Sequence, residues 1–325
     1  MDITTLGPLD NVSRLTLGGG GLGRIWGETT LDEAVATVRA AVEAGITLID
    51  TAPMYMDCEA VIGMAFEGAP PSHIRFTSKC QLGEPERGTV AARLEASLDA
   101  SLATMKLERA DLFFLHSNIR PDDYHYARHD DRRAAFATPC TQYVEEVVPA
   151  MEALKARGRI GGWGITGVGV PGTILDALAH ETKPAVVQAV ANLLDSPGGM
   201  RSYGDAPRPR DIIAAARAAG VGVMGIRAVQ AGALTGALDR EMKVSHPESI
   251  DYRRAAPFRA LCAEIGVDPA LVAHSYALGM EGIDTVILGV KNRQELAECL
   301  GAEAMGPMPD DLRARIDGLG LRDVD

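Results

Sequence analysis

The sequence predicts an α/β chain folded as a (β/α)8 TIM barrel, with residues 1–325 forming a single domain. Short apolar runs alternate with longer amphipathic segments eight times, and no composition break marks a linker. A length of 325 residues is one that such barrels commonly reach as one unit. Because functional groups gather at the carboxyl ends of barrel strands, polar residues directly after each apolar run are the first candidates for a site.

Eight runs rich in apolar and β-branched residues are the predicted strands. In chain order they span 13–17, 46–49, 74–78, 112–115, 161–165, 186–190, 221–226 and 285–288. The predicted helices span 34–44, 58–66, 90–105, 144–156, 175–179, 211–219, 258–265, 269–278 and 293–300. Thr30 and Glu33 have the spacing of a capping box before the first helix, and Gly45 ends it.

Composition excludes several classes of protein. With 44 acidic and 32 basic residues the net charge is −12, so we expect no nucleic-acid surface, and an anionic ligand needs a local basic cluster. The chain has no apolar run of membrane-spanning length and no signal-like start, so we expect a cytoplasmic protein without membrane contact. Five scattered cysteines without a C-x-x-C pair argue against disulfides and structural zinc, and we expect no metal site.

The glycine run that follows the first strand offers one alternative reading. Gly18, Gly20 and Gly23 formally match the dinucleotide fingerprint G-x-G-x-x-G, with Asp50 as the ribose-binding acid. However, residues 24–29 separate the last glycine from the predicted helix, and Asp50 comes 27 residues after Gly23 where about 20 are usual. We therefore favour a loop that lets backbones approach closely at the barrel mouth.

Three polar residues, Asp50, Lys79 and His116, follow the second, third and fourth predicted strands, and Tyr55 lies in the loop after Asp50. In a closed barrel these strand ends are neighbours. Lys79 keeps its charge beside Asp50, and a cation beside a phenol lowers the phenol pKa from about 10, so Tyr55 is the expected proton donor. A neutral His116 can orient a carbonyl. Each residue alone is commonly structural, and only their co-occurrence points to catalysis.

These residues carry a family resemblance. Asp50-Thr51-Ala52-x-x-Tyr55 with Glu59 and Gly63, Thr77-Ser78-Lys79, and the segment 111–116 ending in His116 occur in this order. In them the chain resembles the aldo-keto reductase family, with the aldose or sugar dehydrogenase branch as the nearest likeness. The resemblance implies a (β/α)8 barrel that binds NADPH or NADH in an extended pose and transfers hydride to a carbonyl. It assigns Tyr55 as the acid, Lys79 and Asp50 as its tuners, and His116 as the orienting group.

The resemblance also implies a cofactor site, from which this chain departs at several positions. Thr166 replaces a usual serine, Gly167 replaces the asparagine that helps hold the nicotinamide amide, Gln188 is the expected third contact, and Ile226 replaces a stacking tyrosine. Arg227 is predicted to meet the pyrophosphate, or alternatively to form a rim salt bridge. The predicted cofactor-binding residues are Gly19, Gly20, Asp50, Thr166, Gln188, Ile226, Arg227, Gly232, Gly289, Lys291 and Arg293.

The loop after the last strand supplies the basic cluster that the net charge requires, at an end where barrels tend to bind phosphate. Glu295 stands where many family members carry an arginine that grips the 2′-phosphate of NADPH. Lys291 and Arg293 can supply that charge instead, so NADP is favoured over NAD.

Residues 117–142 form a loop too long for a bare connection, and its aromatic and hydrogen-bonding side chains predict a cover over the barrel mouth. The predicted substrate-contacting residues are Trp26, Tyr55, His116, Tyr124 and Tyr126. They suit a small polar carbonyl or alcohol, such as a sugar, keto-polyol or aldehyde, in a monomer or homodimer. The alternatives are a cofactor-binding regulatory barrel with weak or no catalysis, and a cofactor-free isomerase or lyase with Lys79 as a Schiff-base amine.

Overall fold

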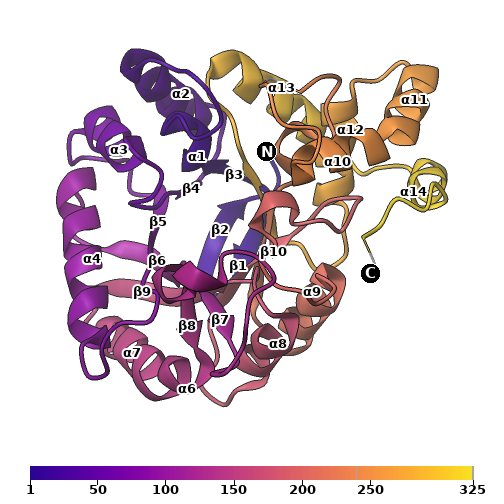
Figure 1. Cartoon of the computed structure of the whole chain (residues 1–325). Helices are drawn as coiled ribbons and strands as arrows, with labels where there is room; N and C mark the ends of the chain where they lie inside the picture. Colours follow the sequence, from indigo (N-terminus) through magenta and orange to yellow (C-terminus); the bar gives the residue numbers. More distant parts are fainter. Residues whose placement is uncertain (239, 324–325) are drawn as a thin grey trace.

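The computed structural model describes residues 1–238 and 240–323, and its centre is a closed barrel of eight parallel strands (Figure 1). β12 pairs with β3 and closes the barrel, with Val286 opposite Leu15. The predicted fold is confirmed, and every predicted strand lies within two residues of its observed bounds. The barrel strands are β3 (Leu15–Gly18), β4 (Leu48–Asp50), β5 (Arg75–Cys80), β6 (Ala110–Leu115), β9 (Ile160–Thr166), β10 (Val186–Val190), β11 (Gly222–Ile226) and β12 (Thr285–Leu288).

Helices surround the barrel as an outer ring (Figure 1). The ring contains α2 (Leu31–Glu43), α3 (Cys58–Phe66), α4 (Val90–Met105), α7 (Val148–Ala156), α8 (Pro171–Ala179), α9 (Pro209–Ala218), α12 (Pro269–Leu278) and α13 (Arg293–Ala304). Further helices are α1 (Gly19–Leu22), α5 (Arg133–Phe136), α6 (Cys140–Gln142), α10 (Pro247–Arg254), α11 (Ala256–Ile265) and α14 (Asp310–Asp317). Within the described ranges, no helix is long and apolar enough to cross a membrane.

Side-chain caps fix where α2 and α13 begin. The Thr30 hydroxyl accepts a hydrogen bond from the Glu33 amide at 3.2 Å, and Asn292 caps α13 by accepting from the Glu295 amide at 2.9 Å. The predicted capping box is only half formed, because the Glu33 carboxylate binds Arg293 on α13 instead of returning to Thr30. The first turns of α2 and α13 are therefore joined.

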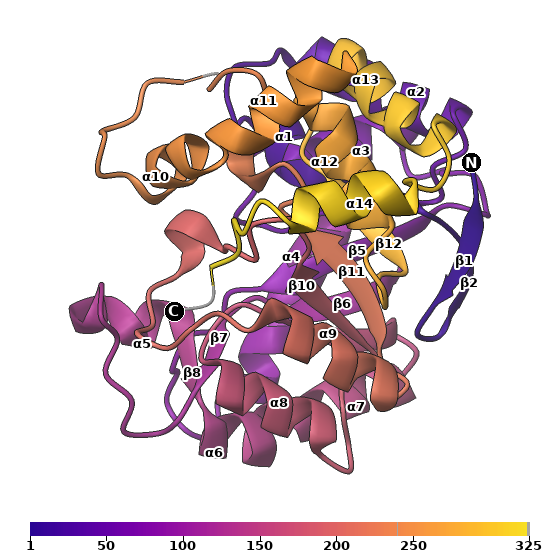
Figure 2. The same cartoon turned by 90° about the vertical axis from the view of Figure 1, so that its right-hand side faces the viewer.

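An N-terminal hairpin, β1 (Ile3–Leu6) and β2 (Leu9–Ser13), covers the amino-terminal end of the barrel (Figure 2). Leu6, Leu9 and Val12 pack in one cluster with inward-facing residues of the barrel strands, including Phe114. Gly7 makes the turn at φ +53°, where an added Cβ would lie 2.6 Å from the Ala185 carbonyl oxygen. The hairpin was not predicted, and it leaves the opposite, carboxyl end as the mouth.

The long loop after β6 is folded over this mouth (Figures 1 and 2). It contains a small parallel sheet of β7 (Asn118–Arg120) and β8 (Ala137–Pro139). Its aromatic residues belong to an apolar group that we name the mouth cluster. The buried members of the mouth cluster are Tyr126, Ala137, Val168, Val170, Val190 and Tyr203, and Tyr124, Phe136 and Ile226 pack against them. The loop is therefore a packed cover.

Candidate active site

A buried ion pair lies at the base of the mouth. The Lys79 side chain is 0% exposed, and its Nζ lies 2.7 Å from Asp50 Oδ2 and donates to the Thr51 carbonyl oxygen at 2.9 Å. The other carboxylate oxygen, Oδ1, accepts from Thr77 Oγ1 at 2.6 Å and from Gln188 Nε2 at 2.7 Å. Side chains two apart on a strand share a face, which brings Thr77 and Lys79 to Asp50 together.

The partners of Lys79 decide its protonation. Burial alone lowers the pKa of Lys79, but the charges and hydrogen bonds of Asp50 and Tyr55 together outweigh burial, so the pKa is raised. An ammonium that donates to Asp50 and Thr51 has no free electron pair. The reading of Lys79 as a Schiff-base amine is therefore disfavoured, because that chemistry needs a neutral lysine.

Tyr55 lies above this pair on a tight turn. Its amide donates to the Ala52 carbonyl at 2.9 Å, and its carbonyl accepts from the Cys58 amide at 3.0 Å, where α3 begins. Lys79 Nζ lies 4.6 Å from the Tyr55 ring centroid. Burial raises the pKa of Tyr55 and the Lys79 charge only partly opposes this, so the predicted net lowering is wrong. The phenol stays protonated at neutral pH, as a proton donor must.

His116 follows β6 and completes the group. Its ring meets the Tyr55 ring edge-on, with centroids 5.7 Å apart at an interplanar angle of 85°. Burial, aided by the Lys79 charge, lowers the pKa of His116 to about 3. Its Nδ1 is buried without a hydrogen-bond partner among the described residues. The structure therefore brings Asp50, Tyr55, Lys79 and His116 together as predicted, with a neutral imidazole.

We expect the His116 ring not to titrate between about pH 5 and 8, where an ordinary histidine does. A folded pKa of about 3 lies below the ordinary value of about 6.5. The folded state then excludes a proton that the unfolded state binds, so this contribution to stability is complete above pH 6.5 and is lost as pH falls toward 3. Histidine ring NMR spectra, assigned with His116→Gln, check this, and a His116 resonance with a midpoint near 6.5 would contradict it.

The glycine run after β3 lies in close contact with two other backbone segments, at Val290 and at Tyr55. A Cβ at Gly21 would lie 2.1 Å from the Val290 carbonyl oxygen, and one at Gly23 would lie 1.7 Å from the Tyr55 carbonyl oxygen. The predicted close approach of backbones is therefore supported, but Gly19–Leu22 form the short helix α1, so the prediction of a loop is wrong there. The packing of Gly23 against the Tyr55 carbonyl fixes the position of the turn that carries Tyr55.

Gly23→Ala is expected to destabilise the protein by about 1–3 kcal/mol and to lower kcat, because the added methyl displaces the Tyr55 turn. The matched control is Gly172→Ala on α8, where nothing lies within 4 Å of an added Cβ. That change should stabilise the helix by about 0.5–1 kcal/mol. Urea unfolding and initial rates measure both effects, and equal stability of the two variants would refute the packing role.

Three predicted cofactor residues lie at the same end of the barrel. Thr166 donates to the Leu115 carbonyl oxygen at 3.2 Å, Gln188 donates to Asp50, and Ile226 packs on the mouth cluster. The packing around residue 167 explains why it is a glycine, because a Cβ there would lie 2.8 Å from the Gln188 carbonyl oxygen. An asparagine at this position would need the β10 backbone to move.

Arg227 forms a buried ion pair. A salt bridge was the alternative to the predicted pyrophosphate contact at this residue. Arg227 Nη2 lies 2.7 Å from Glu248 Oε1, with exposed side-chain fractions of 8% and 6%, and Arg227 Nε donates to Gln230 Oε1 at 2.7 Å. Gly232 follows in the same turn with φ +92°. A pyrophosphate at Arg227 would have to share the guanidinium with Glu248.

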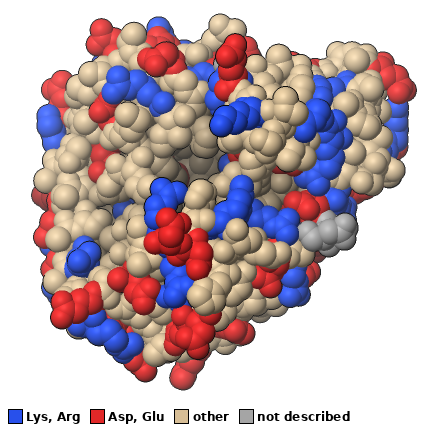
Figure 3. All heavy atoms as spheres, viewed as in Figure 1, with Lys and Arg blue, Asp and Glu red and all other residues tan. Residues whose placement is uncertain are grey.

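The basic loop after β12 is also paired with acids. Lys291 Nζ lies 3.0 Å from Glu295 Oε1, and Arg293 Nη2 lies 2.8 Å from Glu33 Oε2. The hydrogen bonds from Arg293 lower the pKa of Glu33 to about 2. Both basic and acidic residues lie around the hollow on the mouth face (Figure 3). Each predicted phosphate-binding cation thus has a carboxylate partner.

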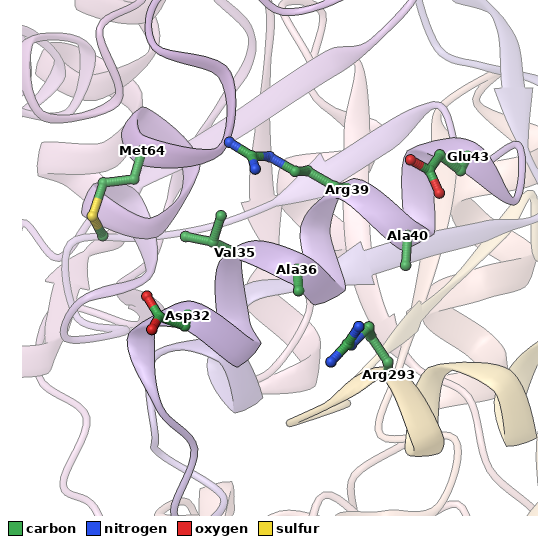
Figure 4. A pocket seen from close by; sticks show the side chains of 8 residues that line it. All are labelled: Asp32, Val35, Ala36, Arg39, Ala40, Glu43, Met64 and Arg293. Atoms are coloured by element: carbon green, nitrogen blue, oxygen red, sulfur yellow. The ribbon is translucent and has the colours of Figure 1, made fainter.

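Arg293 also borders a groove of about 520 Å³ between α2, α3 and α13, lined by Asp32, Arg39 and Met64 among others (Figure 4). The groove lies on the outer ring of helices. It contains none of the four predicted catalytic residues.

Trp26 lies beside the basic loop. A Cβ at Gly20 would lie 2.7 Å from Trp26 Nε1, and one at Gly289 would lie 3.7 Å from it. The Arg240 guanidinium lies 5.7 Å from the indole centroid. Because β3 and β12 are paired, the glycine run and the basic loop that follow these strands are neighbours.

The two predicted substrate tyrosines of the cover differ in their surroundings. Tyr126 is buried in the mouth cluster, whereas Tyr124 Oη donates to Asp205 Oδ2 at 2.5 Å and accepts from the Gly204 amide at 3.1 Å.

The sequence prediction missed Thr77 as a hydrogen-bond partner of Asp50. Its position two before Lys79 on the same strand was the available signal.

Comparison with known proteins agrees with this geometry. The model of the aldo/keto reductase family matches residues 14–320. L-galactose dehydrogenase of Arabidopsis thaliana is 27% identical over 296 residues, which cover 90% of this chain and 84% of that protein.

Two solved structures share the fold. The glycerol dehydrogenase AKR11B4 from Gluconobacter oxydans has a TM-score of 0.70 at 20% identity, covering 98% of this chain and 94% of that one. The holo form of aldo-keto reductase AKR11C1 from Bacillus halodurans has a TM-score of 0.70 at 22% identity, covering 98% and 96%. From the family match over nearly its whole length, the chain belongs to the aldo/keto reductase family and is an oxidoreductase.

Proposed function

We propose that the protein interconverts a small polar carbonyl compound and its alcohol with a nicotinamide dinucleotide, and that Tyr55 donates the proton to the carbonyl oxygen. The observation that carries the proposal is the buried Lys79–Asp50 pair, 2.7 Å apart, beneath Tyr55 and beside His116. When bound, the nicotinamide supplies or accepts the hydride.

The residues of this chain have distinct roles in the proposal. Tyr55 remains a phenol because burial raises its pKa, and it holds the proton until the carbonyl oxygen gains charge. Lys79 stabilises the phenolate that remains, and Asp50 fixes the Lys79 ammonium. His116, neutral at physiological pH, orients the carbonyl oxygen by a hydrogen bond. The packed cover over the mouth limits access of water.

The donor set fits a nicotinamide dinucleotide. The Thr166 hydroxyl and the Gln188 amide lie at the mouth end of neighbouring strands β9 and β10, where they can bind the nicotinamide amide. Gly289, which precedes Lys291 and Arg293 in the chain, has no side chain beside Trp26, and an added Cβ would lie 3.7 Å from Trp26 Nε1. The orphaned His116 Nδ1 supplies a further polar atom near Tyr55.

For the nucleotide, the ion pairs favour NAD, and the proposal departs here from the preference for NADP drawn from the sequence. Glu295 binds both the Lys291 ammonium and the Lys291 backbone amide, the latter at 2.8 Å. Glu33 accepts from Arg293 Nε at 3.1 Å as well as from Nη2. A 2′-phosphate that bound to Lys291 and Arg293 would compete with both carboxylates for these cations, whereas a ribose diol has no charge to be repelled.

Replacing Glu295 or Glu33 with glutamine is expected to tighten NADPH binding by about fivefold each relative to NADH, since each change removes about 1 kcal/mol of charge competition. Glu298→Gln on α13 is the control, because Glu298 accepts only from Gln294 among the contacts described for it. Fluorescence titration with both nucleotides measures the ratio. A wild-type protein that binds NADPH at least tenfold more tightly than NADH would contradict the assignment.

The substrate class is supported by the names of two relatives, an L-galactose dehydrogenase and a glycerol dehydrogenase, and by the charged residues around the hollow of the mouth face (Figure 3). The test is an initial-rate screen of small sugars, polyols and aldehydes with the preferred nucleotide. Turnover of at least one is expected. Tight nucleotide binding without turnover would favour the regulatory barrel, the reading that the changes at Gly167 and Ile226 left open.

A further inference from the structure

We propose that Met54 and Met56, which flank Tyr55, form an oxidation site through which a peroxide reversibly inhibits the enzyme. The inference rests on the proposed function, because its readout is catalysis by Tyr55. It concerns a modification of the mouth loop between β4 and α3.

The exposure of the two methionine residues is the first observation. Met54 is 55% exposed and Met56 is 61% exposed, more than any other methionine among the exposed hydrophobic residues described. Met105, Met151 and Met224 are fully buried, and Met305 on the far part of the chain is 49% exposed. Oxidation of methionine follows access to the sulfur, so Met54 and Met56 should react first.

The second observation is that this turn is held on both sides. The Tyr55 carbonyl is packed against Gly23 and accepts from the Cys58 amide, and Arg24 forms an ion pair with Asp57. Met56 lies in the left-handed region at φ +48°. The Tyr55 ring faces Lys79 while its two neighbours are exposed to solvent. A change in the size and polarity of the flanking side chains therefore acts on the turn that positions the phenol.

Hydrogen peroxide is the oxidant in the proposed conversion of each methionine thioether to a sulfoxide. The O–O bond breaks, one oxygen forms an S=O bond with the thioether sulfur, and the other leaves as water. Sulfur is oxidised and the peroxide is reduced. The sulfoxide is polar and is returned to the thioether by methionine sulfoxide reductases with a thiol reductant.

The nearest thiol is a poor competitor. Cys58 follows Tyr55 by three residues, but its side chain is buried, and burial raises its pKa to about 12. Thiolate, which is the reactive form, is therefore scarce at Cys58. The exposed thioethers remain the reactive sulfurs beside Tyr55.

The test treats the full-length protein with hydrogen peroxide and follows sulfoxide formation and carbonyl reduction in the same samples. Trypsin releases residues 40–75 as one peptide, which carries Met54, Met56 and the internal reference Met64. We expect sulfoxide at Met54 and Met56 before Met64, with activity falling in step by on the order of tenfold or more. Methionine sulfoxide reductase should restore the activity, and dithiothreitol alone should not.

Two leucine double variants, each compared with its own untreated sample, make the test specific. Met54→Leu with Met56→Leu should keep its activity under peroxide, since leucine conserves the volume without the sulfur. Met64→Leu with Met305→Leu should lose activity like the wild type. Loss of activity in the first variant, or oxidation of Met54 and Met56 without loss in the wild type, overturns the inference alone. Absence of turnover before treatment overturns the proposed function, and the inference with it.

Discussion

Tyr55→Phe is expected to lower kcat for carbonyl reduction by about 10²–10⁴-fold while nucleotide affinity is retained. The substitution removes one hydroxyl from a turn whose backbone is fixed by Ala52 and Cys58, so the ring should keep its edge-on contact with His116. Initial rates with saturating nucleotide give kcat, and fluorescence titration gives the affinity.

A second tyrosine serves as the control for this prediction. Tyr252 lies on α10, where its hydroxyl donates to the Gly236 carbonyl at 3.0 Å and its ring stacks on Arg259. Tyr252→Phe should leave kcat unchanged. If Tyr55→Phe retained full activity, the phenol would not be the proton donor, and another acid would have to be sought beside His116.

Lys79→Met is expected to destabilise the protein by about 3–5 kcal/mol and to abolish measurable reduction. Removing one partner of a buried ion pair leaves the other charge uncompensated, and here Asp50 would remain in the barrel interior with only Thr77 and Gln188 as donors. Chemical denaturation gives the free energy of unfolding. Activity of the variant is then assayed without denaturant, so that loss of activity is not caused by unfolding.

The double substitution Asp50→Asn with Lys79→Met separates stability from catalysis. It removes both charges, so it should recover a large part of the lost stability while activity remains lost. A single Lys79→Met variant as stable as the wild type would show that Asp50 is not compensated by Lys79, and the tuning of Tyr55 by this pair would have no basis.

The grouping of Asp50, Tyr55, Lys79 and His116 could be predicted because it follows from local pattern and barrel closure. Asp50, Lys79 and His116 each end an apolar run, and parallel strands place such ends side by side. The direction of the Tyr55 pKa could not be predicted in the same way. The attraction of Lys79 is readable from spacing, but the opposing effect of burial depends on the packing of the finished mouth.

Contacts between distant segments also escaped prediction. Glu33 and Arg293 are 260 residues apart, and nothing in the first turn of α2 indicates that its carboxylate leaves the capping box for α13. The partner of Arg227 is Glu248 on α10, a helix that the sequence pattern did not predict. Each of these acids occupies a basic residue that was predicted to bind the cofactor, and the sequence pattern indicated neither ion pair.

Transfer of deuterium from the nicotinamide, measured by mass spectrometry of the product alcohol, tests the proposed reaction. Wild-type protein would be supplied with nucleotide labelled at the transferring position of its nicotinamide ring and with the carbonyl compound that gives the highest rate. We expect one deuterium on the former carbonyl carbon, and loss of that product in Tyr55→Phe. Product without deuterium, or labelled product formed equally by Tyr55→Phe, would contradict it.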